Sequence, residues 1–216
     1  MATKVLTLLD AINACLRGVG LAPVSSEDDQ SPEAAGAIDN IELASLSILA
    51  MGWWFNLEYN WDLAPNTEGI IKQPNNTIDI IPWGDNRDGL FSIRDSKIYD
   101  MYYHTYDLSS RVKADGKLEF AFIMNIPFES LPEPAKIVIM YQARRLFSQD
   151  ETGDQTMWKL QSADETRAFA ELQRRNAVHN KRNALRHNSV IASRIAVIGG
   201  PNSYGSGLGT FPKRDV

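Results

Sequence analysis

The histidines and the cysteine are the side chains of this sequence that could most readily act as nucleophiles, bases or metal ligands. The chain holds three histidines, His104, His179 and His187, and one cysteine, Cys15. The histidines do not form a His-Glu-x-x-His pattern, and their spacing from Cys15 is not that of a zinc site. Cys15 falls on the apolar face of an expected helix, where cysteine usually packs as a small hydrophobic residue. We therefore expect no metal site and no nucleophilic cysteine.

Paired carboxylates are a second possible source of acid–base chemistry. Glycoside cleavage needs two carboxyl groups about 5–9.5 Å apart, and among 27 acidic residues some pair will meet that condition by chance. Glu129 with Glu133, and Asp85 with Asp88, are the candidate pairs. The tryptophans could line a sugar groove, although core packing is the favoured interpretation. We find no enzyme signature and expect a non-enzymatic protein, with a polysaccharide hydrolase as the alternative.

The glycine-rich end of the chain superficially resembles a dinucleotide-binding loop. Such a loop needs a following helix whose N-terminus holds the pyrophosphate, and only a few residues follow Gly209. We therefore expect no cofactor and interpret residues 191–216 as a flexible C-terminal arm.

Basic residues gather just before this arm. Glu171 is the only acidic residue between Arg167 and Arg194. This segment could be a solvated helix face, a DNA-binding module that contacts phosphates, or a surface that meets another protein. The formal net charge of -5 argues against a general nucleic-acid or membrane binder. We favour a protein interface that becomes ordered on assembly, formed by Arg174, Arg175, Lys181, Arg182, Arg186 and Arg194.

A long helix beginning at Pro32 is expected to organise the fold. Ser31 is a suitable N-cap, Pro32 a suitable first helical residue, and Gly52 a suitable stop. Apolar residues recur along the helix at three- and four-residue spacing, and Leu43, Leu46 and Leu49 widen this apolar face. With residues of a later helix, they predict a core that includes Ile38, Ile41, Ile48, Trp53, Phe55, Ile137, Met140 and Phe147.

The remaining pattern predicts an α+β protein. A first helix is expected from Thr7 to Arg17, a later one from about residue 133 to 149, and a last one from about residue 156. Between residues 58 and 126, short apolar runs separated by turn residues predict an antiparallel meander of about four strands. The expected architecture is an antiparallel bundle of three to four helices with this small meander inserted. Its parts are residues 1–57, 58–126, 127–190 and 191–216.

Composition sets few further limits. The chain has 216 residues, 44% of them hydrophobic, which is enough for a core without disulfides or metals. No apolar stretch approaches the length of about 20 residues that spans a bilayer. Asp10 and Asn13 interrupt the apolar N-terminal run, so we expect neither a signal peptide nor a membrane anchor. A single cysteine fits synthesis in a reducing compartment.

Several sequence blocks together resemble one family over roughly residues 5 to 175. They are the segment from Ala11 to Ser25, Gly52-Trp-Trp-Phe-Asn-Leu-Glu58, Leu63-Ala-Pro65, Ile98-Tyr-Asp100, and Leu131-Pro-Glu-Pro-Ala135 leading to Ala143-Arg-Arg-Leu-Phe147. In these blocks the chain resembles the tail tubular protein A family, the head-to-tail adaptors of short-tailed, podovirus-type bacteriophages. The polar middle is shorter than is usual in the family, and the glycine-rich end matches no block of it.

The resemblance implies a structural virion protein, assembled in the host bacterial cytoplasm. It implies a dodecameric ring between the portal protein and the tail nozzle, which is formed by tail tubular protein B, with phage DNA passing through the centre. Tail fibres are a further candidate partner. The resemblance also implies that the C-terminal region grips the portal, and the mild negative charge suits a channel that should not retain DNA.

Overall fold

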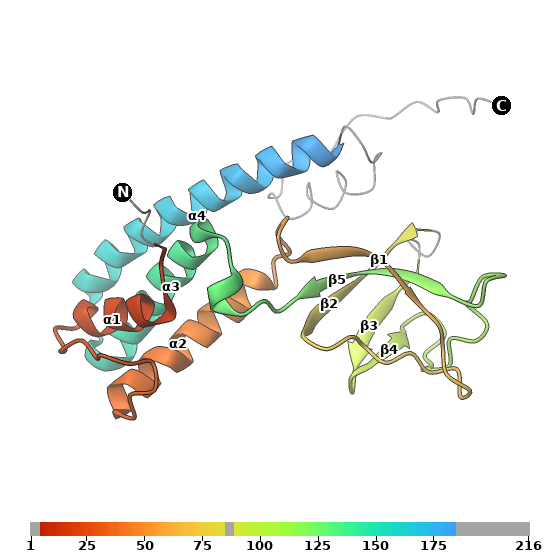
Figure 1. Ribbon diagram of the computed structural model, residues 1–216, viewed down its shortest axis with the longest axis horizontal. Coiled ribbons are helices and arrows are strands. Elements are labelled where there is room, and N and C mark those ends of the chain that lie inside the picture. The colour runs from red at the N-terminus through yellow and green to blue at the C-terminus, as the bar shows by residue number, and fades with distance from the viewer. Residues whose placement is uncertain (1–4, 85–88, 185–216) are drawn as a thin grey trace. The chain divides into compact units, whose positions relative to one another are not determined.

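The computed structural model describes residues 5–84 and 89–184, with only the backbone described for residues 181–184. The chain divides into two compact units, Met1–Asn176 and Ala177–Val216. The first unit holds the described strands, three of the helices and most of the fourth (Figure 1). The chain is therefore a mixed α+β protein, as the sequence predicts.

Four α-helices are described: α1 (Leu8–Gly18), α2 (Pro32–Leu49), α3 (Glu133–Thr152) and α4 (Gln155–Ala184). Local sequence explains most of their ends. The Thr7 side chain accepts a hydrogen bond from the Asp10 N–H in a capping box at the start of α1. At the start of α2, the Ser31 side chain accepts a hydrogen bond from the Ala34 N–H. Gly153 ends α3 in the left-handed conformation, with φ at 62°.

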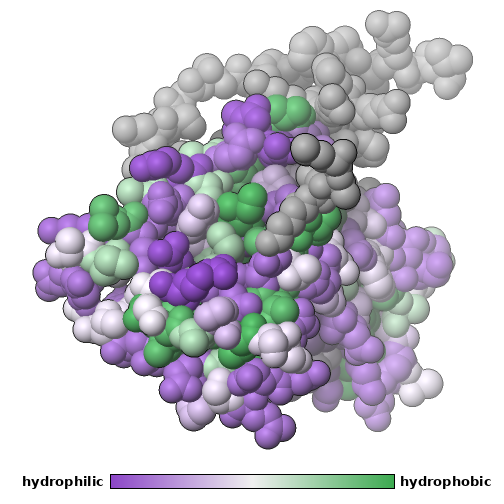
Figure 2. All heavy atoms as spheres, turned by 60° about the vertical axis from the view of Figure 1, so that its left-hand side comes forward, coloured by the Kyte–Doolittle hydropathy of each residue, from purple (hydrophilic) through white to green (hydrophobic). Residues whose placement is uncertain are grey.

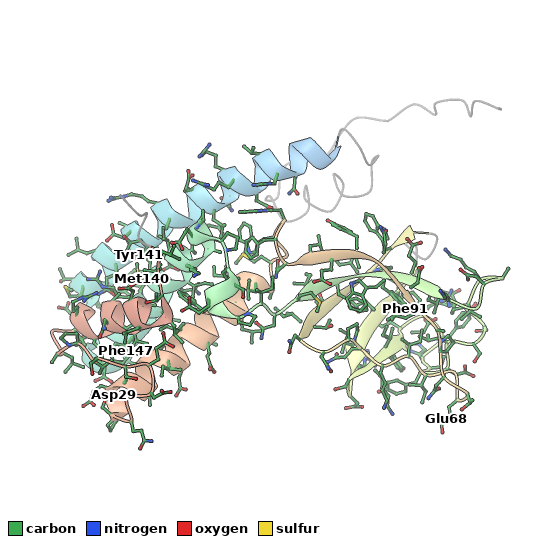
Figure 3. All side chains as sticks on the ribbon, viewed as in Figure 1. Asp29, Glu68, Phe91, Met140, Tyr141 and Phe147 are labelled. Carbon is green, nitrogen blue, oxygen red and sulfur yellow. The ribbon has the colours of Figure 1, made fainter. Side chains whose placement is uncertain are left out.

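The helices enclose one hydrophobic core. Ile41, Ile48, Trp53 and Phe147 are buried in it. Figure 3 labels Phe147 within this bundle, together with Met140. Ile38, Phe55 and Met140 are partly buried and pack against the same core.

Ile137 does not belong to this core, so the prediction for this residue was wrong. Its side chain is 38% exposed. The buried face of α3 runs through Ala135, Val138 and Ile139, and Ile137 lies on another side of the helix. Because apolar residues lie on several sides of α3, their spacing alone does not show which side of the helix is buried.

Two small antiparallel sheets form the β-rich part. β1 (Leu57–Leu63), β5 (Leu118–Met124) and β2 (Thr77–Pro82) make a three-stranded sheet in the order β1-β5-β2. β3 (Phe91–Arg94) and β4 (Lys97–Asp100) form a separate hairpin. A second core, which includes Ile98, Phe120 and Phe122, lies here, and Figure 3 labels its Phe91.

The sheet order corrects the expected meander. β5 is the last strand in sequence, yet it lies in the centre of its sheet and pairs with both β1 and β2. Its run Phe-Ala-Phe-Ile is buried, and because successive side chains point to opposite faces, both faces of this strand are covered. β1 was not predicted, although Leu57, Tyr59 and Trp61 alternate with exposed residues in the manner of an edge strand.

A tight turn joins α2 to β1. Gly52 has φ at 71°, and a Cβ placed on it would lie 3.1 Å from the Cδ1 atom of Ile123 in β5. Asn56 is fully buried in the same turn. Its amide donates to the carbonyl oxygens of Leu49 and Met124, and its Oδ1 accepts from the Trp53 N–H. The block from Gly52 to Asn56 thus ties the end of α2 to β5.

Candidate assembly surfaces

The basic segment of α4 is exposed where the structure describes its side chains. Arg174 Nη2 lies 2.7 Å and Arg175 Nε 2.9 Å from Glu171 Oε1. Hydrogen bonds from Arg174 and Arg175 lower the pKa of Glu171 to about 2, so this carboxylate stays charged at any physiological pH. Of the other predicted interface residues, Lys181 and Arg182 lie on α4 with only their backbone described, and Arg186 and Arg194 lie outside the described residues.

The buried side of α4 fastens this helix to the bundle. Leu172 is buried in the helical core, and Phe169 meets the ring of Trp53 edge-on at 5.8 Å. Gln161 donates to the Ser148 hydroxyl at 2.9 Å, and Arg145 of α3 pairs with Glu165. These contacts leave the opposite side of α4 turned away from the core.

Exposed apolar side chains mark two further surfaces of the bundle. Leu43 and Leu46 project from α2, and Trp158 and Leu160 from the first turns of α4. The sequence had grouped Leu43 and Leu46 with Leu49 on one apolar face, but only Leu49 is buried. In Figure 2, which turns the bundle toward the viewer, separate hydrophobic groups stand among hydrophilic ones.

The proposed carboxylate pair Glu129 and Glu133 holds the start of the chain. Glu133 accepts hydrogen bonds from the Leu6 N–H, and Glu129 accepts one from the Leu8 N–H at 2.6 Å. Between them lies Lys136, whose side chain is 1% exposed and donates to the Leu6 carbonyl oxygen at 2.9 Å. Both carboxylates are thereby engaged in a structural contact. The other proposed pair, Asp85 and Asp88, lies outside the described residues.

An aromatic and cationic loop follows β4. Asp100 is buried and accepts hydrogen bonds from the N–H groups of Tyr102 and Tyr103 and from Arg111 Nε at 2.6 Å. Arg111 also lies 4.4 Å from the centre of the Tyr103 ring. Burial alone would raise the pKa of Asp100, but these hydrogen bonds and the Arg111 charge lower it below its usual value. Asp100 therefore acts as the anchor that fixes two exposed tyrosines.

The other potentially reactive side chains belong to different elements of the chain. Cys15 is buried, and burial raises the pKa of its thiol to about 12, so it is protonated at neutral pH. His104 is exposed in the loop after β4, and His179 lies on α4. His187 is outside the described residues. Over residues 5–84 and 89–184, no group of three or more His, Cys, Asp or Glu side chains could hold a metal ion.

None of the described helices is both long enough and apolar enough to cross a membrane.

Comparison with known proteins assigns the chain to one family. A family model described as "Tail tubular protein" matches residues 9–182, a range that includes nearly all of the described elements. The chain is also similar to tail tubular protein A of Klebsiella phage KP34, with 29% identity over 147 residues, covering 68% of this chain and 74% of that protein. Because the family model covers well over half of the sequence, the chain belongs to the tail tubular protein family.

Proposed function

We propose that this protein forms an adaptor ring between the portal and the tail nozzle of a short-tailed phage, through which DNA passes. Membership of the tail tubular protein family makes it a structural component of the phage tail. The observation that carries the finer proposal is the extent of the match over residues 9–182, which takes in both the helical and the β-rich parts. The similarity to tail tubular protein A of Klebsiella phage KP34 supports the same role.

Features of the described surface support an assembling protein. Leucines and a tryptophan stand exposed on α2 and α4, and covering such side chains on association is favourable. Two different apolar surfaces suit head-to-tail contacts, which close into rings. We propose a dodecamer in the virion, with the portal protein and tail tubular protein B above and below it, and with tail fibres as further partners.

The residues that were considered as catalytic candidates make structural contacts. Glu129 and Glu133 contact the N-terminal segment and Lys136, and Cys15 is buried and protonated. The proposal is therefore of a non-enzymatic protein. Release of reducing sugars from host polysaccharide, abolished by replacing one of these carboxylates, would favour the hydrolase alternative.

We also propose that the C-terminal basic segment and arm contact the portal or the neighbouring subunit. Arg174 and Arg175 are the described part of this surface. The arm, residues 191–216, lies outside the described residues, and its glycine-rich composition favours a segment that orders on assembly. In the same proposal, residues 1–57 and 127–190 form the bundle that carries the arm, and residues 58–126 form the inserted β-rich part.

Native mass spectrometry of the protein with its purified portal tests the ring directly. The expected result is a complex in which many copies of this chain join one portal ring. The chain deleted from Gly199 to Val216 should keep its melting temperature and bind the portal more weakly. A chain that stays monomeric and unbound beside its portal would contradict the proposal.

A further inference from the structure

The outward face of α2 carries exposed leucines that no other part of the described structure covers. Leu43 is 57% and Leu46 49% exposed, and Ala50 is exposed one turn further on. The opposite face of the same helix carries Ala44 and Ile48 in the bundle core. Leu43 and Leu46 are thus the large apolar side chains on the solvent side of α2.

Acidic side chains border this apolar face. Asp39 and Glu42 are exposed on the same side of α2 as the leucines, because Asp39 lies four residues before Leu43 and Glu42 four residues before Leu46. We call Asp39, Glu42, Leu43, Leu46 and Ala50 the α2 stripe. It extends along the helix for about 16 Å.

The outward face of α4 carries basic residues and small apolar residues, which complement the acidic residues and leucines of the α2 stripe. Leu160, Ala163, Arg167, Ala170 and Arg174 recur there at three- and four-residue spacing, and all are exposed. We call these five residues the α4 stripe. Arg167 and Arg174 have side chains that are 79% and 65% exposed, and their intrahelical acidic partners, Asp164 and Glu171, are themselves partly exposed. The small alanines leave room for larger side chains from another helix to approach closely.

The two stripes lie on different sides of the helical bundle. Leu172 of α4 and Ile48 of α2 belong to the same core, and each stripe is on the far side of its helix from that core. Figure 1 shows α4 along the upper side of the bundle and α2 along the lower side. One copy of the chain can therefore offer its α2 stripe to one neighbour and its α4 stripe to another.

We propose that the α2 stripe of each copy packs against the α4 stripe of the next copy. Leu43 and Leu46 then fill the space over Ala163 and Ala170, while the acidic residues of α2 face Arg167 and Arg174. Opposite charges on the two stripes favour this pairing over contact between like stripes. The contact is head-to-tail, so it repeats from copy to copy and closes when the rotation allows. This inference rests on the proposed ring and identifies the surfaces that build it.

Charge reversal of each stripe tests the contact. The protein is assembled with its portal, and rings are counted by electron microscopy at a series of protein concentrations. Asp39→Arg with Glu42→Arg should raise the concentration needed for half-assembly at least tenfold, and so should Arg167→Glu with Arg174→Glu. The chain that carries all four changes should assemble within about threefold of the wild type. Glu68→Arg, on the β-rich part (Figure 3), is the matched control and should have no effect.

Engineered cysteines give an independent measurement. The native Cys15 is buried, so introduced cysteines at exposed positions can be oxidised selectively. Leu46→Cys combined with Ala163→Cys should produce a ladder of covalent multimers in the assembled particles, and either change alone should not. Melting temperatures close to that of the wild type show that each variant folds.

The outcomes separate this inference from the proposed function. Rings that form normally despite reversal of the α2 stripe would overturn the contact and leave the adaptor role intact. Normal rings that no longer bind the portal would mean that the α2 stripe docks the portal. Covalent dimers from Leu46→Cys alone would show a twofold contact and also overturn the inference. If the wild-type chain forms no ring with its portal, the proposed function fails and this contact fails with it.

Discussion

At the residue scale, Asn56 links the two parts of the described fold. Its side chain makes hydrogen bonds to main-chain groups of Trp53, Leu49 and Met124, and it is fully buried. A buried polar group that loses its hydrogen-bond partner cannot bond to water instead, so replacing Asn56 should cost free energy of folding. Asn56 is the last residue of the Gly-Trp-Trp-Phe-Asn block, and these hydrogen bonds explain why the turn needs an asparagine there.

Replacing Asn56 should therefore destabilise the protein strongly. Asn56→Ala removes three hydrogen bonds, and we expect it to lower the free energy of unfolding by about 3 kcal/mol. Asn56→Asp keeps an acceptor for the Trp53 N–H but cannot donate, so it should also destabilise. Urea denaturation followed by circular dichroism measures both. The exposed Asn75→Ala is the control, and a similar midpoint for all of the variants would refute this account of the turn.

The Asp100–Arg111 pair predicts a particular dependence on acid. The folded-state pKa of Asp100 lies below the unfolded value of about 3.9. The ionised carboxylate therefore stabilises the fold above that value, and its contribution is lost as the pH falls through the folded-state pKa. Asp100→Asn should be less stable than the wild type at pH 7 and should lose less stability between pH 5 and pH 2.5. Urea midpoints across that range measure the slopes.

The control for this pH dependence is Asp62→Asn, an exposed position on β1. It should keep the slope of the wild type. Equal slopes for the wild type and Asp100→Asn would mean that Asp100 is not held ionised by Arg111 and the loop N–H groups.

At the scale of elements, the turn after α2 lies so close to β5 that position 52 has no room for a side chain. Gly52→Ala introduces a Cβ 3.1 Å from Ile123 Cδ1 at a residue with φ at 71°, and we expect a loss of about 2 kcal/mol. Gly153→Ala has the same positive φ but open space around it, so it should cost only about 1 kcal/mol. Ile123→Val removes Cδ1 and should partly rescue Gly52→Ala. Additive effects in this double-mutant cycle would contradict the steric explanation.

The start of α3 controls the N-terminal segment. Lys136→Met removes the donor to the Leu6 carbonyl oxygen but keeps an apolar side chain in the buried position. Amide hydrogen exchange over residues 5–8 should become at least about tenfold faster, because the segment can then open locally. The global urea midpoint should change little, because the carboxylates left behind, Glu129 and Glu133, are 52% and 42% exposed and stay hydrated. The exposed Lys117→Met should leave this exchange unchanged. Unchanged exchange in Lys136→Met would exclude a role for Lys136 in holding the segment.

Elements defined by local signals were predictable from the sequence. Ser31, Pro32 and the apolar period placed α2 within a few residues of its observed end at Leu49. Strand order was not predictable, because the pairing of β5 with β1 joins residues far apart in the chain. The same limit applies to the candidate surfaces. Periodicity identified Leu43 and Leu46 as apolar, but only the packed structure shows that they face away from the core.

At the scale of the whole molecule, several buried polar groups and ion pairs of the described residues join segments that are far apart in the sequence. Charged and polar side chains in buried positions hold segments together, as Lys136 holds the N-terminal segment and Asp100 the tyrosine loop. Apolar side chains that could stabilise a monomer core are instead exposed on α2 and α4. In the proposed ring, neighbouring copies cover these side chains.

The position of the chain in the virion tests the adaptor role most directly. Electron microscopy of phage particles that carry a gold-binding tag on this protein measures that position. The account predicts label confined to a single ring at the junction of head and tail. Label at the tail tip or on the fibres, or particles without this chain that still join head to tail, would contradict it.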